Sequence, residues 1–221
     1  MQNASTREQT AAHEDAVVID ANPRISEDLR SAVLAAAAQV FDVVGYHNAS
    51  MGAIADRVGV SKTAVLGLYR AKHEILHEIH DSWIDELLSM ASHHDEPPDA
   101  FCAAIRAYIF DILTVIERRR GSVRLYFESY RDLPPDLQKH AKAKRDLYEA
   151  QVEGVIRRGI ESGVFLPQSA RVAAFALFGM CNWTYQWYRS AGRLSVNDIA
   201  AQMCGIYLRG MCVRPEDAID E

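Results

Sequence analysis

The stretch SMGAIADRVGVSKTAVLGLY, which begins at Ser50, constrains the fold more than any other part of the chain. Ala55 is small enough for two helices to cross closely, and Gly59 stands where a turn needs the positive φ that glycine adopts freely. Ser50 and Ser61 each precede a short apolar run, a position in which a serine side chain caps a helix N-terminus. The stretch therefore predicts two short helices joined by a tight turn, which is a helix-turn-helix.

The rest of the chain also has helical spacing. Apolar side chains recur three to four residues apart, and no segment alternates with period two between turn residues, so we expect an all-α fold without a sheet. Ser26 is expected to cap the first helix, Gly121 to separate two helices, and Ser195 with Asp198 to form a capping box. About nine helices are predicted, at roughly 26–44, 50–58, 61–68, 71–93, 98–120, 122–131, 135–162, 168–190 and 196–212.

Charge is distributed unevenly along the chain. The 221 residues carry a net charge of −6, whereas Arg24 to Lys72 hold six Lys or Arg against four Asp or Glu, a local charge of +2. A DNA-binding N-terminal segment needs this asymmetry. No export signal is visible, and the uncharged run 172–188 is short and polar for a membrane span. We therefore expect a cytoplasmic protein without a membrane partner.

The cysteines indicate the same compartment. None of the four stands in a C-x-x-C spacing, and all lie inside apolar helical patterns. Buried, reduced thiols are the simplest interpretation. These residues are Cys102, Cys181, Cys204 and Cys212.

The second helix of the helix-turn-helix has an exposed polar face in this interpretation. Lys62, Thr63 and Gly67 lie on it, and such a second helix enters the major groove of DNA. The alternative is an ordinary helical hairpin inside a core, because small residues at helix crossings also occur without DNA.

The sequence on both sides of this motif resembles that of a known protein family. The run VLAAAAQVFDVVGYHNASMGAIADRVGVSKTAVLGLYRAKHEIL is similar over its whole length to the N-terminal domain of the TetR family of bacterial transcription regulators. The resemblance implies a three-helix DNA-binding domain at 23–70 and a ligand-binding and dimerisation domain at 71–214. Tails are expected at 1–22 and 215–221.

The resemblance also implies DNA contacts. Ser50, at a helix N-terminus, and Lys72, as a point charge, would contact phosphates. This chain differs from the family at Leu66 and Gly67, where an aromatic residue, often followed by histidine, is usual. The aromatic hydroxyl normally helps to bind a phosphate, so either the operator contact is made differently here or DNA binding is weaker. The residues expected to face base edges are Ser61, Lys62, Thr63, Ala64 and Gly67.

A metallohydrolase pattern, H-E-x-x-H, occurs at His73, Glu74 and His77. Catalytic zinc needs three fixed protein ligands and an open position, and the pattern supplies only two ligands. The metzincin continuation fails because His80 stands where glycine is required. We therefore expect an exposed helix face, with no catalytic residue, no metal and no cofactor. A zinc hydrolase is the weaker alternative, and pH or metal sensing by these histidines is another.

A segment dense in aromatic residues, AAFALFGMCNWTYQWYRSAGRLS, follows Val172. Trp183 and Trp187 would share one helix face, in a dimer interface or in a pocket wall. The run FGMCNWTYQWYRSAGRLS also resembles the corresponding helix of TetR-family regulators of fatty-acid and steroid-ring degradation, which respond to acyl-coenzyme A (acyl-CoA) thioesters. The predicted ligand-binding residues are Phe110, Tyr126, Phe127, Tyr130, Phe178, Asn182, Trp183, Trp187 and Arg124.

Several arginines in the middle of the chain have two interpretations. Guanidinium groups suit the phosphates of a CoA ligand, and cations also complement the C-terminus of a helix. The residues concerned are Arg118, Arg119, Arg120, Arg124 and Arg131.

These features predict a ligand-responsive transcriptional regulator, a repressor. We expect it to bind a palindromic double-stranded DNA operator as a homodimer, formed through its last two helices. A small hydrophobic effector, with an acyl-CoA thioester as a candidate, would release it from DNA. The alternative is a protein of the same fold that binds a lipid or a partner and has weak or lost DNA binding.

Overall fold

The computed structural model describes residues 23–93 and 100–212, so the predicted tails at 1–22 and 215–221 lie outside the described residues. The all-α class is confirmed. Extended pairing within these ranges is limited to one antiparallel bridge, between Phe165 and Cys212. None of the described helices is long and apolar enough to cross a membrane. The helices are α1 (Pro23–Val44), α2 (Met51–Val58), α3 (Lys62–Leu68), α4 (Lys72–Ala91), α5 (Phe101–Ser129), the 3-10 helix η1 (Tyr130–Asp132), α6 (Pro135–Glu161), α7 (Ala170–Asn182), α8 (Thr184–Trp187) and α9 (Val196–Met211).

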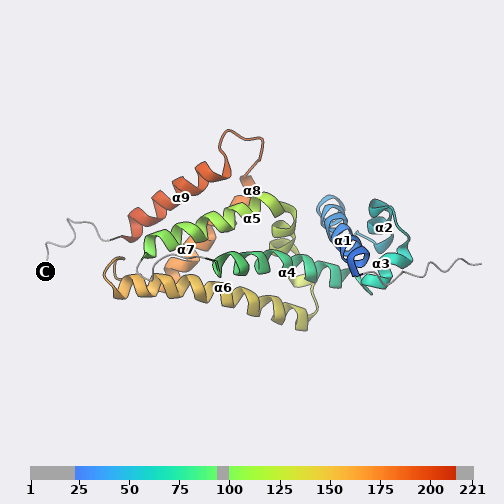
Figure 1. Ribbon diagram of the computed structural model, residues 1–221, viewed down its shortest axis with the longest axis horizontal. Coiled ribbons are helices and arrows are strands. Elements are labelled where there is room, and N and C mark those ends of the chain that lie inside the picture. Colours follow the sequence, from blue (N-terminus) through green and yellow to red (C-terminus); the bar gives the residue numbers. More distant parts are fainter. Residues whose placement is uncertain (1–22, 94–99, 213–221) are drawn as a thin grey trace, which may run out of the picture.

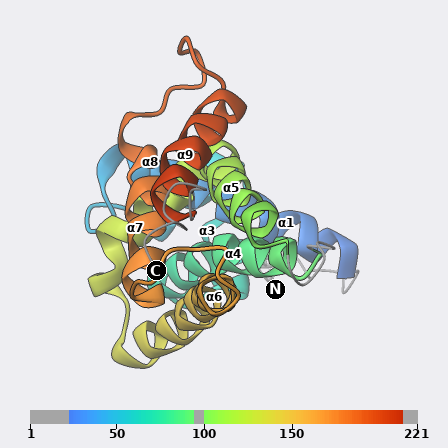
Figure 2. The same ribbon diagram turned by 90° about the vertical axis from the view of Figure 1, so that its left-hand side faces the viewer.

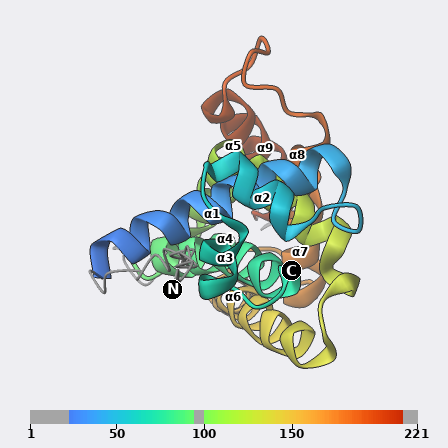
Figure 3. The same ribbon diagram turned by 90° about the vertical axis from the view of Figure 1, so that its right-hand side faces the viewer.

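The molecule is elongated, with two parts joined by α4 (Figure 1). We call α1–α3 the head and α5–α9 the body. The helix α4 runs from the head into the body, where it packs between α5 and α6 (Figure 2). The view from the opposite end shows α1, α2 and α3 in front of the body (Figure 3).

The local geometry of the helix-turn-helix follows the prediction. The Ser50 hydroxyl accepts a hydrogen bond from the Ala53 N–H at 3.1 Å, and the Ser61 hydroxyl accepts one from the Ala64 N–H at 3.1 Å. Gly59 ends α2 with φ of 81°, a conformation that costs other residues about 1–2 kcal/mol. Each of these three residues therefore sets a helix boundary through its own chemistry.

Other boundaries were only partly predicted. The capping box of Ser195 and Asp198 is confirmed, but α1 begins at Pro23 instead of after Ser26, because proline suits a first helical turn. The break expected at Gly121 is a kink inside α5, with non-helical angles at Arg119 (φ −127°, ψ 32°). The Arg119 guanidinium is held there by Glu86, with Nε 2.6 Å from Oε2.

The predicted helix at 168–190 is two helices in the structure. The first helix, α7, ends at Asn182. The second, α8, covers only Thr184–Trp187, and the chain becomes extended at Tyr188. The aromatic residues of this segment are therefore divided between two helices, and the expectation of one continuous helix is wrong.

The helix α4 belongs to two hydrophobic cores. Its first half buries Ile75, Leu76 and Ile79 in a core with α1–α3. Its second half buries Trp83 and Leu87 in the core of the body. The head core also includes residues after the kink in α5, so the head is packed against the body and not only connected to it.

The cysteines differ from one another in burial. Cys181 and Cys204 are buried, as predicted, whereas Cys102 and Cys212 are half-buried with their Sγ atoms 3.5 Å apart. All four are free thiols. Burial raises the pKa of Cys212 to about 11, which keeps this thiol protonated near neutral pH.

A histidine lies between the two cores of α4. His80 is fully buried, with its ring centroid 5.2 Å from that of Tyr126. Burial lowers the pKa of His80 to about 4, because the charged imidazolium would lose its hydration. The ring is therefore neutral near pH 7.

The buried His80 predicts a loss of stability in mild acid. Between about pH 6.5 and pH 4 the unfolded chain binds a proton at this residue and the folded chain does not, so the free energy of unfolding falls as the pH drops. The free energy of unfolding should fall between pH 7 and pH 5 by about 2 kcal/mol less in His80→Leu than in the wild type. Urea unfolding at both pH values measures it. A His80→Leu variant that keeps the wild-type pH dependence would contradict this expectation.

Candidate functional site

The candidate DNA interface is the outer face of α3. Val65 is fully buried in the head core and sets the rotation of this short helix. As a result Lys62, Thr63 and Gly67 are exposed, together with the capping residue Ser61. The predicted base-facing residues therefore share an accessible surface, except Ala64, which is half-buried. Leu66 is also exposed, to 39%, so an apolar side chain occupies part of this face.

The N-terminus of α2 is a second candidate contact with DNA. Ser50 is exposed and caps this helix, whose free N–H groups favour an anion. The structure thus places Ser50 where the predicted phosphate contact requires it, at the surface and at a helix N-terminus.

Lys72 has a structural role that was not predicted. Its ammonium donates hydrogen bonds to the carbonyl oxygens of Tyr46 (2.8 Å), His47 (2.9 Å) and Ala49 (3.3 Å). It also lies 4.6 Å from the centroid of the Tyr46 ring. An ammonium has three N–H donors, and all three are used here. Lys72 therefore holds the loop before α2 against α4 in the absence of DNA, and its phosphate contact stays a prediction.

A partly buried network that the sequence did not reveal holds the end of α3. The Tyr69 hydroxyl donates to Glu78 Oε2 at 3.0 Å, and Arg30 Nε donates to Glu78 Oε1 at 2.6 Å. Burial raises the pKa of Tyr69 well above its usual range. The network joins α1, α3 and α4, so it orients the recognition face relative to α4.

The candidate ligand site is a small cavity in the body. It has a volume of about 40 Å³ and lies among α4, α5, α6 and α7. This is about the space of one water molecule, so the surrounding side chains nearly fill the cavity. The predicted residues that line it are Tyr126, Phe127, Phe178 and Asn182. The lining residues that were missed are Trp83, Ile84, Leu87, Ile112, Arg145, Tyr148 and Glu149.

The other predicted ligand residues lie elsewhere. Arg124 Nη1 is 3.0 Å from Asp42 on α1, and its Nε is 3.0 Å from Glu128. The Tyr130 hydroxyl donates to the Gln138 carbonyl, and Phe110 packs against the edge of the body core. None of these three lines the cavity.

The two tryptophans also lie away from the cavity. Trp183 is 62% exposed and Trp187 is 46% exposed, and neither contributes to the lining. They were predicted to stand in either a pocket wall or a dimer interface, and the structure places them outside the wall of this cavity.

Three of the arginines line an open cleft of about 380 Å³ between α1 and α5. Arg118 and Arg119 both contact Glu86, and Arg120 Nε donates to the Tyr185 carbonyl at 2.8 Å. Because Arg119 has non-helical angles, the first part of α5 ends at this kink, and the three arginines stand at its C-terminal end, where cations complement the helix dipole.

The H-E-x-x-H histidines do not form a shared site. The ring of His77 lies against that of His140 on α6, with centroids 5.2 Å apart. Among the described residues, the group that could hold a metal contains His77 and lacks both His73 and Glu74. The zinc-hydrolase arrangement therefore has no geometric support.

A capped, exposed recognition helix is joined through α4 to an all-α body with an apolar cavity. This architecture defines the class of helix-turn-helix regulators. Residues 33–79 match the family model described as bacterial regulatory proteins, tetR family. Residues 96–211, more than half of the chain, match the model described as tetracyclin repressor-like, C-terminal domain. The chain belongs to the TetR family of bacterial transcriptional regulators.

Three relatives illustrate the range of the family. The HTH-type transcriptional activator FasR of Mycolicibacterium smegmatis is 28% identical over 138 residues, which are 62% of this chain and 63% of FasR. The chain thus spans under two thirds of this curated relative. The TetR family transcriptional regulator PfmR from Thermus thermophilus is 27% identical with a TM-score of 0.75, covering 80% of this chain and 97% of PfmR.

The third relative shares the fold. AibR, whose structure is described as a complex with isovaleryl coenzyme A and operator DNA, is 24% identical with a TM-score of 0.71. The match covers 80% of this chain and 96% of AibR.

The contacts of Lys72 predict a structural effect of its substitution. Lys72→Met removes three hydrogen bonds from a charged donor, so we expect the free energy of unfolding to fall by about 1–3 kcal/mol in the absence of DNA. Denaturant unfolding measures this change. Lys62→Met, at an exposed position on α3, is the matched control and should leave stability nearly unchanged. A stability of Lys72→Met equal to that of the wild type would contradict this structural role.

Proposed function

We propose that the protein is a ligand-responsive transcriptional regulator that binds a palindromic operator as a homodimer. The observation that carries the proposal is the exposed, serine-capped face of α3, held outward by the buried Val65. Lys62 and Thr63 supply a cation and a hydroxyl on this face, which suits backbone contact and base readout. Two such helices, one from each protomer, would enter successive major grooves.

Exposed apolar side chains support a dimer through the last helices of the body. Val172 and Phe175 on α7 and Ile206 on α9 are 66%, 46% and 61% exposed. With the exposed Trp183 and Trp187, they make an apolar surface of the kind that is buried in homodimer interfaces. The proposed interface is thus formed by α7, the short α8 and α9.

The proposed coupling runs through α4. Trp83 and Leu87 line the cavity on the same helix that buries Ile75 and Ile79 in the head. A ligand that requires a wider cavity would favour a different position of α4 and hence a different spacing of the two α3 helices. The ion pair between Arg124 and Asp42 is a second connection between body and head.

The proposed effector is a small hydrophobic molecule, with an acyl-CoA thioester as the candidate. The cavity wall is largely aromatic and aliphatic, with Asn182, Arg145 and Glu149 as polar groups. A volume of about 40 Å³ does not hold an acyl group, so binding would select a more open conformation of the body. AibR, which shares the fold, is described in complex with isovaleryl coenzyme A. We propose release from DNA on binding, although the relative FasR is named an activator.

The DNA-binding proposal predicts specific effects of substitutions on α3. With the duplex upstream of its own gene in an anisotropy assay, Thr63→Ala should cost about 1–3 kcal/mol of discrimination against an unrelated duplex. Lys62→Ala should weaken binding to both duplexes and lower the slope of log affinity against log salt by about 1. Lys139→Ala, an exposed lysine on α6, is the control. Weak binding without discrimination by the wild type would favour the alternative of a fold that has lost DNA binding.

The effector proposal predicts that ligands change DNA binding through the cavity. Acyl-CoA thioesters of increasing chain length should lower the affinity of the wild type for its operator. Asn182→Leu removes a polar group from the cavity wall and should raise the required effector concentration at least about tenfold, with DNA affinity unchanged without ligand. Lys139→Ala, exposed on α6 and outside both the cavity lining and the proposed interface, is the control. The proposal fails if no acyl-CoA or hydrophobic acid alters operator binding.

A further inference from the structure

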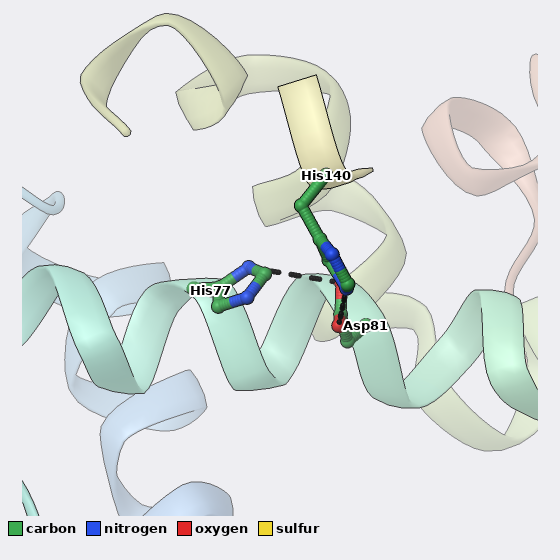
Figure 4. Close-up of side chains that lie close together, drawn as sticks. All are labelled: His77, Asp81 and His140. Atoms are coloured by element: carbon green, nitrogen blue, oxygen red, sulfur yellow. Dashed lines mark hydrogen bonds and ion pairs between the residues drawn. The ribbon is translucent and has the colours of Figure 1, made fainter. Parts of the chain in front are cut away.

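Three side chains from two helices meet beside the junction of head and body. His77 and Asp81 lie one turn apart on α4, and His140 points toward them from α6 (Figure 4). His140 Nε2 is 3.1 Å from Asp81 Oδ2, and His77 Nδ1 is 3.7 Å from Asp81 Oδ1. One ligand atom from each of the three residues lies within 4.8 Å of the others. Two imidazoles and one carboxylate thus surround a common point.

Two of the facing atoms have no hydrogen-bond partner among the described residues. Both His77 Nδ1 and Asp81 Oδ1 are buried from solvent, and the 3.7 Å between them is too long for a hydrogen bond. Buried polar atoms are normally paired, so two that face each other require an explanation. A cation between them would satisfy both, because it accepts a lone pair from the ring nitrogen and from the carboxylate.

The three donors suit a divalent transition-metal ion. Zinc binds imidazole nitrogen and carboxylate oxygen at about 2.0–2.2 Å, so two ligand atoms of a tetrahedral site lie about 3.3–3.6 Å apart. The pairs at 3.1 Å and 3.7 Å are close to this spacing, and the ring of His140 already lies against that of His77, with centroids 5.2 Å apart. The exposed side of the site leaves a coordination position for water.

The surroundings are acidic on the side from which an ion would enter. An open cleft of about 530 Å³ lies next to His77 and Asp81, between the head and α4. Glu74, Glu78 and Asp85 also line it, with Arg30 as the only arginine or lysine of the lining. Clustered carboxylates raise the local concentration of cations.

One basic side chain competes for the site. Lys144 Nζ is 2.7 Å from Asp81 Oδ2 and 2.8 Å from Asp85 Oδ2. A metal ion on Asp81 would repel this ammonium, which still has Asp85 as a partner. Competition between the Lys144 ammonium and the metal ion for Asp81 would lower the affinity for the metal. Removing the ammonium should therefore strengthen metal binding, which provides a test.

We propose that His77, Asp81 and His140 form a binding site for a divalent transition-metal ion, with Zn²⁺ as the best fit. The ion would join α6 to α4 where α4 passes from the head core to the body core. This site differs from the H-E-x-x-H pattern, since it uses neither His73 nor Glu74. It does not depend on the proposed regulatory function, because binding is measured without DNA and without an effector.

The test is a zinc titration of the untagged, metal-stripped full-length protein in competition with a chromophoric chelator. We expect one Zn²⁺ per chain. His140→Ala should weaken binding by more than about tenfold, because losing even an outer-shell partner of a metal site costs about 10–100-fold. His73→Ala is the matched control and should bind like the wild type. Lys144→Gln should bind more tightly than the wild type.

The outcomes separate the competing explanations. An absence of zinc binding by the wild type overturns the proposal, and so does wild-type binding by His140→Ala. A loss of binding in His73→Ala together with wild-type binding by His140→Ala would assign the metal to the H-E-x-x-H pair instead. Thermal unfolding controls for folding, since Zn²⁺ should raise the Tm of the wild type and of His73→Ala but not that of His140→Ala. Because His140 is exposed, its substitution should leave the metal-free Tm nearly unchanged.

Discussion

The position of the head depends on the burial of α4 in two cores at once. Ile75 and Ile79 lie in the head core, and Trp83 and Leu87 lie in the body core, along one uninterrupted helix. Backbone hydrogen bonds make such a helix stiff, so a change in its packing at one end moves the side chains at the other. The recognition face of α3 is therefore oriented by contacts in the body as well as by those within the head.

The cavity and the proposed metal site both act on this helix, from different sides. Trp83, Ile84 and Leu87 of α4 line the cavity, whereas His77 and Asp81 face α6 nearer to the head. A ligand that widens the cavity and an ion that joins α4 to α6 would each favour particular positions of the same element. Two sites that bias one element are coupled by linkage, so each changes the apparent affinity of the other.

Sequence reasoning was strongest where one residue determines its own surroundings. Ser50 and Ser61 cap their helices through their own hydroxyls, and Gly59 supplies the positive φ of the turn. It was weaker where partners come from distant segments. The acceptors of the Lys72 ammonium are carbonyl groups some 25 residues earlier in the chain, so the sequence did not reveal that this residue also holds a loop. Trp183 and Trp187 were candidates for the cavity because aromatic content does not reveal which face of a helix is buried.

The sequence by itself determined the all-α class, the helix-turn-helix with its caps, and the resemblance to the family that the matches then established. These properties depend on local chemistry and on periodicity, which can be read along the chain. Only the tertiary structure decided which side chains meet. His77 stood in an H-E-x-x-H pattern with His73, yet its neighbours in space are Asp81 and His140, the latter brought by α6. Spacing along a helix limits which residues share a face, but the packing of a second helix selects the partner that completes a site.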